Sequence, residues 1–276
     1  MDMTPALPRV LLVEDDAAIR HFVSLSLETL ALELHSCGSL EQAREALRSG
    51  PFALVLLDLM LPDGSGLELL PPALATPGGA ATKWVVFSAG LTPEPEQGLR
   101  ALGVWALLRK PVSVDILRSC VAQALAEAPD CPGADTVLPA PEASDQDVDA
   151  RADAALPQAE GYTPEGLFDD GSDPAERAAV QAYFEGDRAL FELMKRSTLP
   201  RLEADRRSGD AAWARSDAAA LRRLAHSLKS VMRLIGRPQA ALLAQRLEMA
   251  AQHGTRDEVA EAWALLRPCL GGAQDT

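Results

Sequence analysis

Two nearly unbroken apolar stretches constrain the fold of this 276-residue chain more than any other feature. Residues 9–13 read RVLLV and residues 52–57 read FALVLL, and both have the length of a β-strand. A strand that is apolar at consecutive positions is buried on both faces, as in a parallel sheet covered by helices. Both stretches end in acid, because the acidic triplet 14–16 follows the first and Asp58 follows the second.

Helical segments separate the strand-like stretches. The segments AAIRHFVSLSLETL and SLEQAREALRSG have helical periods, and the second begins at Ser39, with Gln42 three residues later, and ends at Gly50. Two further apolar stretches, WVVF and VWALL, precede Ser88 and the triplet 109–111, and a last helix is expected at 113–127. This repeated strand–helix order predicts an α/β doubly wound parallel sheet.

The carboxyl ends of the strands of such a sheet form its ligand site. The polar residues expected there are Glu14, Asp15, Asp58, Ser88 and Lys110. Carboxylates that are held together repel one another unless a cation lies among them, and a site of oxygen ligands suits Mg²⁺. A metal-bound carboxylate, a hydroxyl and an ammonium can surround a phosphoryl group and stabilise its transfer onto one carboxylate as an acyl phosphate.

The order of these motifs, VEDD, then Asp58 with LMLPDGSG, then FSAG and RKP, resembles the receiver domain of two-component response regulators. The resemblance covers residues 8–128 and implies a five-stranded, flavodoxin-like sheet. It implies that Asp58 is the phosphoacceptor, that Ser88 is the switch hydroxyl and that Lys110 contacts the phosphoryl group. It further implies a cis peptide between Lys110 and Pro111, and Mg²⁺ bound by Glu14, Asp15, Asp58 and the carbonyl of Met60.

One position departs from the receiver pattern. The family usually carries Tyr or Phe three residues before this lysine, where the chain has Leu107. Trp105 lies two positions earlier, and strand alternation predicts that its side chain shares a face with Leu107.

Residues 129–170 are predicted to be a linker. The piece 130–172 holds eleven acidic residues and one basic residue, is rich in Pro and Ala, and has no sustained apolar period. A segment of this composition cannot bury enough apolar surface to offset the entropy of ordering. We therefore expect a flexible acidic tether between two domains.

Residues 171–272 read as an all-α antiparallel bundle. Asp173-Pro174-Ala175-Glu176 and Thr255-Arg256-Asp257-Glu258 are typical helix starts. Gly236 should end one helix and Pro238 should begin the next, and Pro200 is expected to bend or interrupt the segment 188–208.

The central helix of this bundle carries His226. Its apolar stripe is expected to comprise Leu221, Leu224, Ala225, Leu228, Met232 and Ile235. A second face, expected to be exposed, comprises Arg222, Arg223, His226, Lys229, Ser230, Arg233 and Arg237. Cations beside an exposed imidazole would balance the charge of an incoming phosphoryl group and attract an acidic pocket.

The motif Ala225-His226-Ser227-Leu228-Lys229, with Gly236 after it and Leu247-Glu248 on the next helix, resembles a histidine phosphotransfer (HPt) domain. The resemblance implies that His226 is phosphorylated with the assistance of Lys229, and that this domain has no ATP site. Ser230 stands where the family commonly has Gly. His21, His35 and His253 lack this setting and are expected to be structural or surface residues.

Together the two resemblances imply a phosphorelay protein that receives phosphate from a sensor histidine kinase and serves a downstream receiver, as a transfer intermediate and not a turnover enzyme. An adaptor whose bundle binds another protein without phosphotransfer is the first alternative. A DNA-binding regulator is the second, but the chain has a net charge of −14 and the segment after Gly236 offers no basic reading helix.

The sequence also suggests a cellular setting. It contains no stretch of about 18 uncharged apolar residues, so we expect a cytoplasmic protein that does not enter the membrane. Cys37, Cys120, Cys131 and Cys269 have no paired spacing, and we expect reduced thiols. The direction of phosphate flow between Asp58 and His226, and the oligomeric state, stay open.

Overall fold

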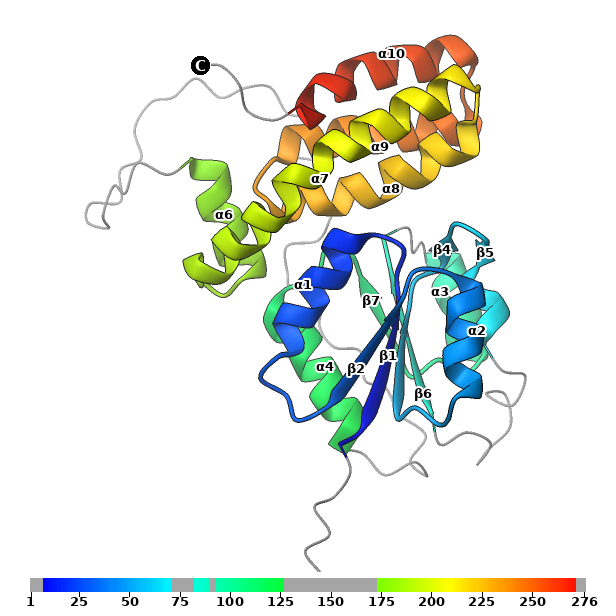
Figure 1. The fold of residues 1–276 in the computed structure, drawn as a ribbon, viewed down its shortest axis with the longest axis vertical. Helices are drawn as coiled ribbons and strands as arrows, with labels where there is room; N and C mark the ends of the chain where they lie inside the picture. The colour runs from blue at the N-terminus through cyan, green and yellow to red at the C-terminus, as the bar shows by residue number, and fades with distance from the viewer. Residues whose placement is uncertain (1–6, 71–81, 90–92, 127–172, 272–276) are drawn as a thin grey trace, which may run out of the picture.

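The structure, a computed structural model, describes residues 7–70, 82–89, 93–126 and 173–271. The predicted linker 129–170 and Cys131 lie outside these residues. The first described unit is a sheet with helices on both faces, and the second is a helical bundle (Figure 1). The elements of the first unit are β1 (Arg9–Val13), α1 (Ala17–Leu27), β2 (Glu33–Cys37), α2 (Leu40–Arg48), β3 (Leu54–Leu57), β4 (Met60–Leu61), β5 (Gly64–Ser65), the 3₁₀ turn η1 (Gly66–Leu69), β6 (Lys83–Ser88), α3 (Pro93–Ala101), β7 (Ala106–Arg109) and α4 (Val114–Ala126).

The sheet has five parallel strands in the order β2-β1-β3-β6-β7, which confirms the predicted fold class. β1, β3, β6 and β7 correspond to the four apolar stretches of the sequence. β2 lies at the edge and reads ELHSC, with only its last residue buried, so it lacks the continuous apolar pattern of the inner strands. β4 and β5 form a separate antiparallel pair after β3.

Alternate side chains of each strand contribute to two apolar layers. Val10, Leu12, Val85 and Phe87 lie in the layer covered by α1 and α4. The opposite face packs against α2 through Leu11, Val13, Val55 and Leu57 and against α3 through Val86. The inner strands are therefore buried on both sides, as their composition requires.

Trp105 does not share a face with Leu107, contrary to the alternation argument. Leu107 packs with Val86 and Leu99 beneath α3, whereas Trp105 packs against the layer under α1 and α4, with the ammonium of Lys83 5.4 Å from its ring centre. The reason is that β7 begins at Ala106, so Trp105 precedes the strand and strand alternation does not apply to it. Trp105 therefore does not replace the missing aromatic at position 107.

The bundle consists of α6 (Pro174–Tyr183), α7 (Arg188–Ala214), α8 (Ala218–Leu234), α9 (Pro238–His253), α10 (Arg256–Leu266) and the 3₁₀ turn η3 (Arg267–Leu270). Several predicted boundaries hold. Thr255 and Glu258 form a capping box, Gly236 with a φ of 73° follows α8, and Pro238 begins α9. Asp173 caps α6, but the side chain of Glu176 bonds Lys195 and does not complete a box.

Of the two effects expected of Pro200, interruption of the helix does not occur, because α7 continues through it from Arg188 to Ala214; a bend stays a prediction. Proline removes one backbone hydrogen bond from a helix interior, and tertiary packing must offset this loss. Phe191, Met194 and Leu202 on both sides of Pro200 are fully buried, which supplies such packing.

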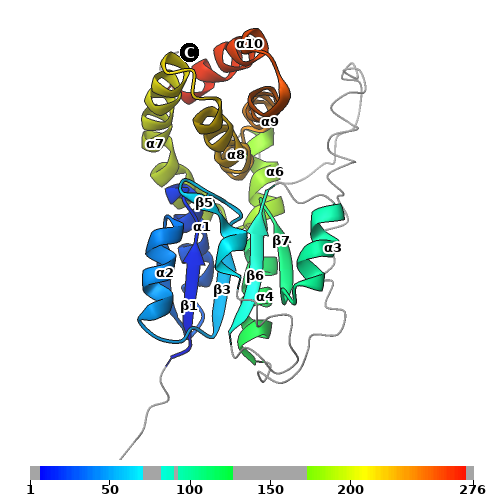
Figure 2. The same cartoon turned by 90° about the vertical axis from the view of Figure 1, so that its right-hand side faces the viewer.

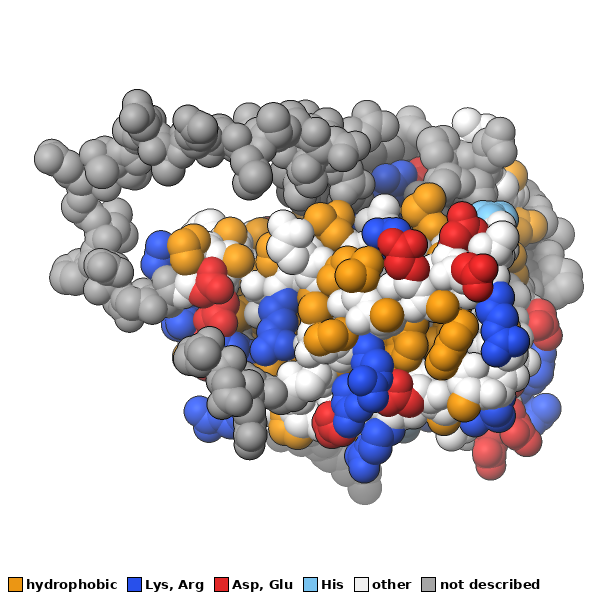
Figure 3. All heavy atoms as spheres, turned by 90° about the horizontal axis from the view of Figure 1, so that it is seen from above, with side chains coloured by type: hydrophobic (Ala, Val, Ile, Leu, Met, Phe, Trp, Pro, Cys, Tyr) orange, Lys and Arg blue, Asp and Glu red, His pale blue; other side chains and the backbone are white. Residues whose placement is uncertain are grey.

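The bundle lies beyond the end of the sheet toward which the strands point (Figures 1 and 2). The face of the bundle that is turned away from the sheet carries basic and acidic side chains interspersed with apolar ones (Figure 3). Among the described residues, no helix combines the length and hydropathy needed to cross a membrane. Cys37, Cys120 and Cys269 are free thiols.

Close packing of α7 on α10 yields a stability prediction. A Cβ atom on Gly209 would lie 2.1 Å from the ring of Trp263, whose indole N–H donates to Asp210 and resists displacement. Gly209→Ala should therefore destabilise the bundle by roughly 1–3 kcal/mol, although alanine favours helices. Urea unfolding followed by circular dichroism measures the change.

Gly98 is the matched control for this substitution. It also lies inside a helix, α3, but a Cβ atom there would meet no described atom within 4 Å. Gly98→Ala should stabilise its domain by about 0.5–1 kcal/mol through helix propensity alone. Equal effects of the two substitutions would contradict the steric argument.

Candidate functional site

An acidic pocket lies at the carboxyl ends of β1, β3 and β7. Glu14 and Asp15 directly follow β1, and Asp58 directly follows β3. The hydrogen bonds between β1 and β3 continue one residue past the end of β3, since the backbone N–H of Asp58 donates to the carbonyl of Val13 over 2.9 Å. One carboxylate oxygen from each of the three acids lies within 4.8 Å of the others. The topology thus brings Asp58 beside two acids, Glu14 and Asp15, that precede it by more than forty residues.

The ammonium of Lys110 lies among these acids. It donates to a carboxylate oxygen of Asp58 over 2.7 Å and also to Glu14. Lys110, Glu14 and Asp58 are each no more than 5% exposed. The Lys110–Pro111 peptide is cis, as predicted. Buried charges of this kind are tolerated only when they are paired and hydrogen-bonded.

The acids perturb one another's ionisation. Burial, assisted by the charge of Asp58, raises the pKa of Glu14 well above its usual value despite the opposing attraction of Lys110. Burial and the charge of Asp58 raise the pKa of Asp15 to about 6. Burial by itself would lower the pKa of Lys110, but the charges of Asp58 and Glu14 outweigh it and raise that pKa. One ammonium therefore does not balance three carboxylates, and the pocket suits a divalent cation bound by oxygen.

Two further predicted site residues lie at this edge of the sheet. Ser88 is the last residue of β6, and its side chain is 2% exposed. Met60 begins β4, and its backbone N–H donates to Oδ1 of Asp58 over 3.2 Å. The expected bond from the Met60 carbonyl to a metal ion remains a prediction.

His226 is buried and not exposed, which corrects the sequence-based expectation. The residue is only 3% exposed, and Lys229, also expected at the surface, is 8% exposed. From Leu228 to Gly236 only Arg233 is not buried, so this half of α8 is covered on nearly all sides. An amphipathic pattern identifies the face turned toward the bundle core but cannot reveal what covers the opposite face.

Glu248 on α9 holds the imidazole in one orientation. Oε1 of Glu248 lies 2.6 Å from Nδ1 of His226, and Oε2 accepts from the ammonium of Lys229 over 2.8 Å. Burial by itself would raise the pKa of Glu248, but the hydrogen bonds and charges of His226 and Lys229 lower it to about 2. Glu248 is therefore ionised at neutral pH and can only accept hydrogen bonds, so Nδ1 is assigned as the donor. In the neutral ring the lone pair is then on Nε2.

Sequence reasoning named Glu248 as part of the HPt motif but gave it no role at the site. The spacing of His226 and Lys229 offered part of the signal for this role. Residues three apart lie on the same side of a helix, so one carboxylate on a neighbouring helix can bond both. Sequence reasoning also placed Lys229 on an exposed face, which is wrong, because the residue is buried and its ammonium pairs with Glu248. Removing Lys229 would leave this carboxylate without one of its two partners.

The line of residues around His226 on α8 contains further unpaired polar atoms. Arg222, His226 and Ser230 follow one another at four-residue steps and so lie along one side of the helix. Nε of Arg222, Nε2 of His226 and Oγ of Ser230 are buried and have no hydrogen-bond partner among the described residues. Buried polar groups are nearly always paired in native proteins, so these three atoms are exceptions among the described residues.

One acid of the bundle lies near the receiver. Asp205 of α7 lies near Asp16: burial together with the charge of Asp16 raises the pKa of Asp205 to about 6. Asp16 caps α1 directly after Asp15 of the pocket. The edge of the acidic pocket is therefore close to α7 of the bundle.

Family models match both units of the chain. A model for the response regulator receiver domain matches residues 10–122, and a model for the Hpt domain matches residues 190–276. These matches confirm the predicted order of a receiver followed by a histidine phosphotransfer domain.

Curated relatives share part of the chain. Response regulator protein PilR of Pseudomonas aeruginosa is 35% identical over 121 residues, which is 42% of this chain and 26% of PilR. Virulence sensor protein BvgS of Bordetella pertussis is 32% identical over 134 residues, which is 45% of this chain and 11% of BvgS. The chain thus spans about a quarter or less of the length of these two relatives.

Solved structures resemble the chain over less than half of its length. The signal receiver domain of a putative Luxo repressor protein from Vibrio parahaemolyticus is 26% identical, with a TM-score of 0.40, and the match covers 44% of this chain and 91% of that one. A CheY-like receiver domain protein from Methanospirillum hungatei is 27% identical, with a TM-score of 0.39 and coverage of 44% and 94%. From the two family matches, the parallel sheet and the helical bundle, we conclude that this chain joins a response regulator receiver domain to an Hpt domain.

Proposed function

We propose that the chain acts in a two-component phosphorelay, with Asp58 as the phosphoacceptor of the receiver and His226 as the phosphate carrier of the Hpt domain. One observation carries the proposal: a single chain holds a buried carboxylate–lysine pocket and a histidine whose Nδ1 is bonded to an ionised carboxylate. The first is suited to accept a phosphoryl group and the second to deliver one from Nε2.

In the receiver, a carboxylate oxygen of Asp58 attacks phosphorus of a phosphohistidine. The new O–P bond forms as the N–P bond breaks, and the electron pair of that bond returns to the imidazole nitrogen. Lys110 moves its ammonium from Asp58 to an oxygen of the transferred group, and Ser88 donates its hydroxyl to another. Glu14, Asp15, Asp58 and the Met60 carbonyl would hold Mg²⁺, which offsets the negative charge of the phosphoryl oxygens when it is bound.

In the Hpt domain, Glu248 sets the protonation of His226. With Nδ1–H donating to Glu248, the ring that leaves phosphorus is a neutral imidazole with its lone pair on Nε2. No separate proton transfer is then needed, and the reverse attack by Nε2 uses the same tautomer. Lys229 shares Glu248 and provides positive charge beside the transferred group.

A sensor histidine kinase is the proposed donor, and the receiver of a downstream response regulator is the proposed acceptor. A cytoplasmic location agrees with this role and also stays a proposal. The low exposure of His226 favours the main alternative, a protein-binding adaptor without phosphotransfer. The fate of phosphate at His226 distinguishes the two.

The first prediction concerns Asp58. Acetyl phosphate should label the full chain with base-labile phosphate only when Mg²⁺ is present, because the carboxylates of the pocket otherwise repel the anionic donor. Asp58→Asn should abolish this label, whereas Asp115→Asn, which changes an exposed acid on α4, should retain it. Label on Asp58→Asn, or undiminished labelling in excess EDTA, contradicts the assignment.

The second prediction concerns His226. The full chain mixed with a phosphorylated receiver should acquire acid-labile, base-stable phosphate, and His226→Gln should remove it. His253→Gln is the matched control, because His253 lies exposed at the end of the neighbouring helix α9. If His226→Gln takes up as much phosphate as the unaltered protein, the adaptor alternative is preferred.

The third prediction concerns Glu248. Glu248→Gln should slow phosphate transfer by roughly tenfold or more, because an amide can donate as well as accept and no longer imposes one tautomer. It should also destabilise the Hpt domain by roughly 1–2 kcal/mol, through loss of two charge-assisted hydrogen bonds. Glu261→Gln, which changes an exposed ion pair between α9 and α10, should alter both quantities little.

Glu248→Gln should also change how the stability of the protein depends on pH. The pKa of Glu248 is about 2 in the folded protein, below its usual value of 4.5. The interaction of the Glu248 carboxylate with His226 and Lys229 thus contributes fully to stability above about pH 4.5, and this contribution is lost as the pH falls from there toward 2. Unfolding measured between pH 3 and pH 7 should show a smaller loss of stability in Glu248→Gln than in the unaltered protein; equal losses would show that Glu248 carries no such linkage.

A further inference from the structure

The receiver and the bundle share one continuous apolar cluster. It includes Phe22 of α1 and Val121 of α4 on the receiver side, and Val180, Phe184 and Phe191 on the bundle side. The ring of Phe184 packs edge-on against Phe22 at 5.7 Å and against Phe191 at 5.5 Å. All three rings are no more than 2% exposed. Contacts between domains that dock transiently are usually more polar, so this cluster indicates lasting association.

A polar contact borders the aromatic cluster. Arg118 of α4 lies 4.0 Å from the carboxylate of Glu185, which follows Phe184 in the connection between α6 and α7. Both side chains are partly exposed, as is typical of the rim of an interface. The segment that makes these contacts, α6 with the start of α7, largely precedes the residues matched by the Hpt family model, which begin at 190.

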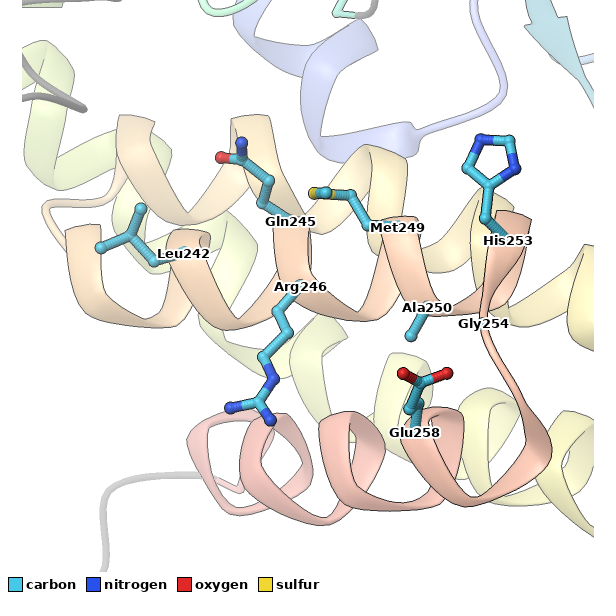
Figure 4. A pocket seen from close by; sticks show the side chains of 8 residues that line it. All are labelled: Leu242, Gln245, Arg246, Met249, Ala250, His253, Gly254 and Glu258. Carbon is cyan, nitrogen blue, oxygen red and sulfur yellow. The ribbon is translucent and has the colours of Figure 1, made fainter. Parts of the chain in front are cut away.

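In Figure 1, α8 lies on the side of the bundle nearer the sheet, and α10 lies on the far side. Polar atoms of Arg222, His226 and Ser230 on α8 are buried without described partners. Oε1 of Gln245 on α9 is likewise buried without a described hydrogen-bond partner. Figure 4 shows Gln245, Met249 and His253 extending from α9 to the side on which the receiver ribbon lies, whereas Arg246 and Glu258 lie toward α10.

We propose that α6 and the start of α7 clamp the Hpt domain onto α1 and α4 of its own receiver, so that His226 faces the acidic pocket of the same chain and is shielded from other proteins while the clamp is closed. The occupant of the receiver's α1–α4 surface is therefore a segment of this chain, residues 174–194. The clamp acts whether or not His226 carries phosphate, so it can be tested without phosphotransfer. An external receiver reaches His226 only after the aromatic contact opens.

The test measures access to His226 in the full chain. Diethyl pyrocarbonate acylates accessible imidazoles, and mass spectrometry reports each histidine separately. In the unaltered protein His226 should react at least about tenfold more slowly than His253, which serves as the exposed reference in the same molecule. Phe184→Ser should bring the two rates within about threefold and should increase the radius of gyration measured by X-ray scattering.

Two controls separate the clamp from general damage to the fold. Leu193→Ser also replaces an apolar residue with serine, but Leu193 is 46% exposed on α7, so the protection of His226 should persist. If Phe184→Ser unfolds the bundle, as judged by circular dichroism, the clamp is tested instead with the ion pair between Arg118 and Glu185 at the rim of the contact. Arg118→Glu and Glu185→Arg should each increase the reactivity of His226, and the double exchange should restore protection.

The proposal is overturned if His226 of the unaltered protein reacts as fast as His253. It is also overturned if a folded Phe184→Ser variant keeps both the protection of His226 and the original radius of gyration. Phosphotransfer assays can still succeed in either case, so failure of the clamp is distinguishable from failure of the proposed phosphorelay role.

Discussion

Repulsion among the carboxylates at the edge of the sheet is the constraint on which the receiver depends. Parallel strands end at one edge, and this places Glu14, Asp15 and Asp58 within 4.8 Å of one another. A buried group of like charges is stable only with cations among them, and Lys110 offsets part of the excess. The remaining negative charge makes the pocket suited to a divalent cation. The phosphoryl acceptance proposed for Asp58 uses this same imbalance of charge.

The bundle shows the opposite arrangement of charge. One carboxylate, Glu248, serves both His226 and Lys229, and Arg222 lies one turn before the histidine. The part of α8 around His226 thus carries more cations than acids, whereas the receiver pocket carries more acids than cations. Electrostatic complementarity of this kind favours docking in one orientation, and salt should weaken it. The polar atoms buried along α8 are consistent with such a junction, because they lack partners within the bundle.

Apolar packing and charge have different roles between the receiver and the bundle. The rings of Phe22, Phe184 and Phe191 provide non-directional attraction and set the distance between domains. The charged residues of α8 and of the pocket select which face is presented. Because the aromatic contact lies on α6 and the start of α7, it can hold the bundle in place without occupying the phosphate-carrying face. The residues that anchor the domain are therefore separate from those proposed to carry out the chemistry.

The sequence by itself determined the parallel sheet, the helical bundle and the residues of the acidic pocket. Continuous apolar stretches, helix starts at Asp173 and Thr255, and acids at strand ends are local signals that do not depend on distant neighbours. Sequence patterns failed at positions whose conformation depends on tertiary contacts. The edge strand β2 has no continuous apolar pattern, and Trp105 lies outside strand alternation. In the bundle, α7 continues through Pro200. Only the tertiary structure showed that Glu248 holds His226 and that the second face of α8 is buried. Helical periodicity reports which side of a helix is apolar, whereas burial of its polar side depends on neighbouring elements such as α9, whose Glu248 bonds His226 and Lys229.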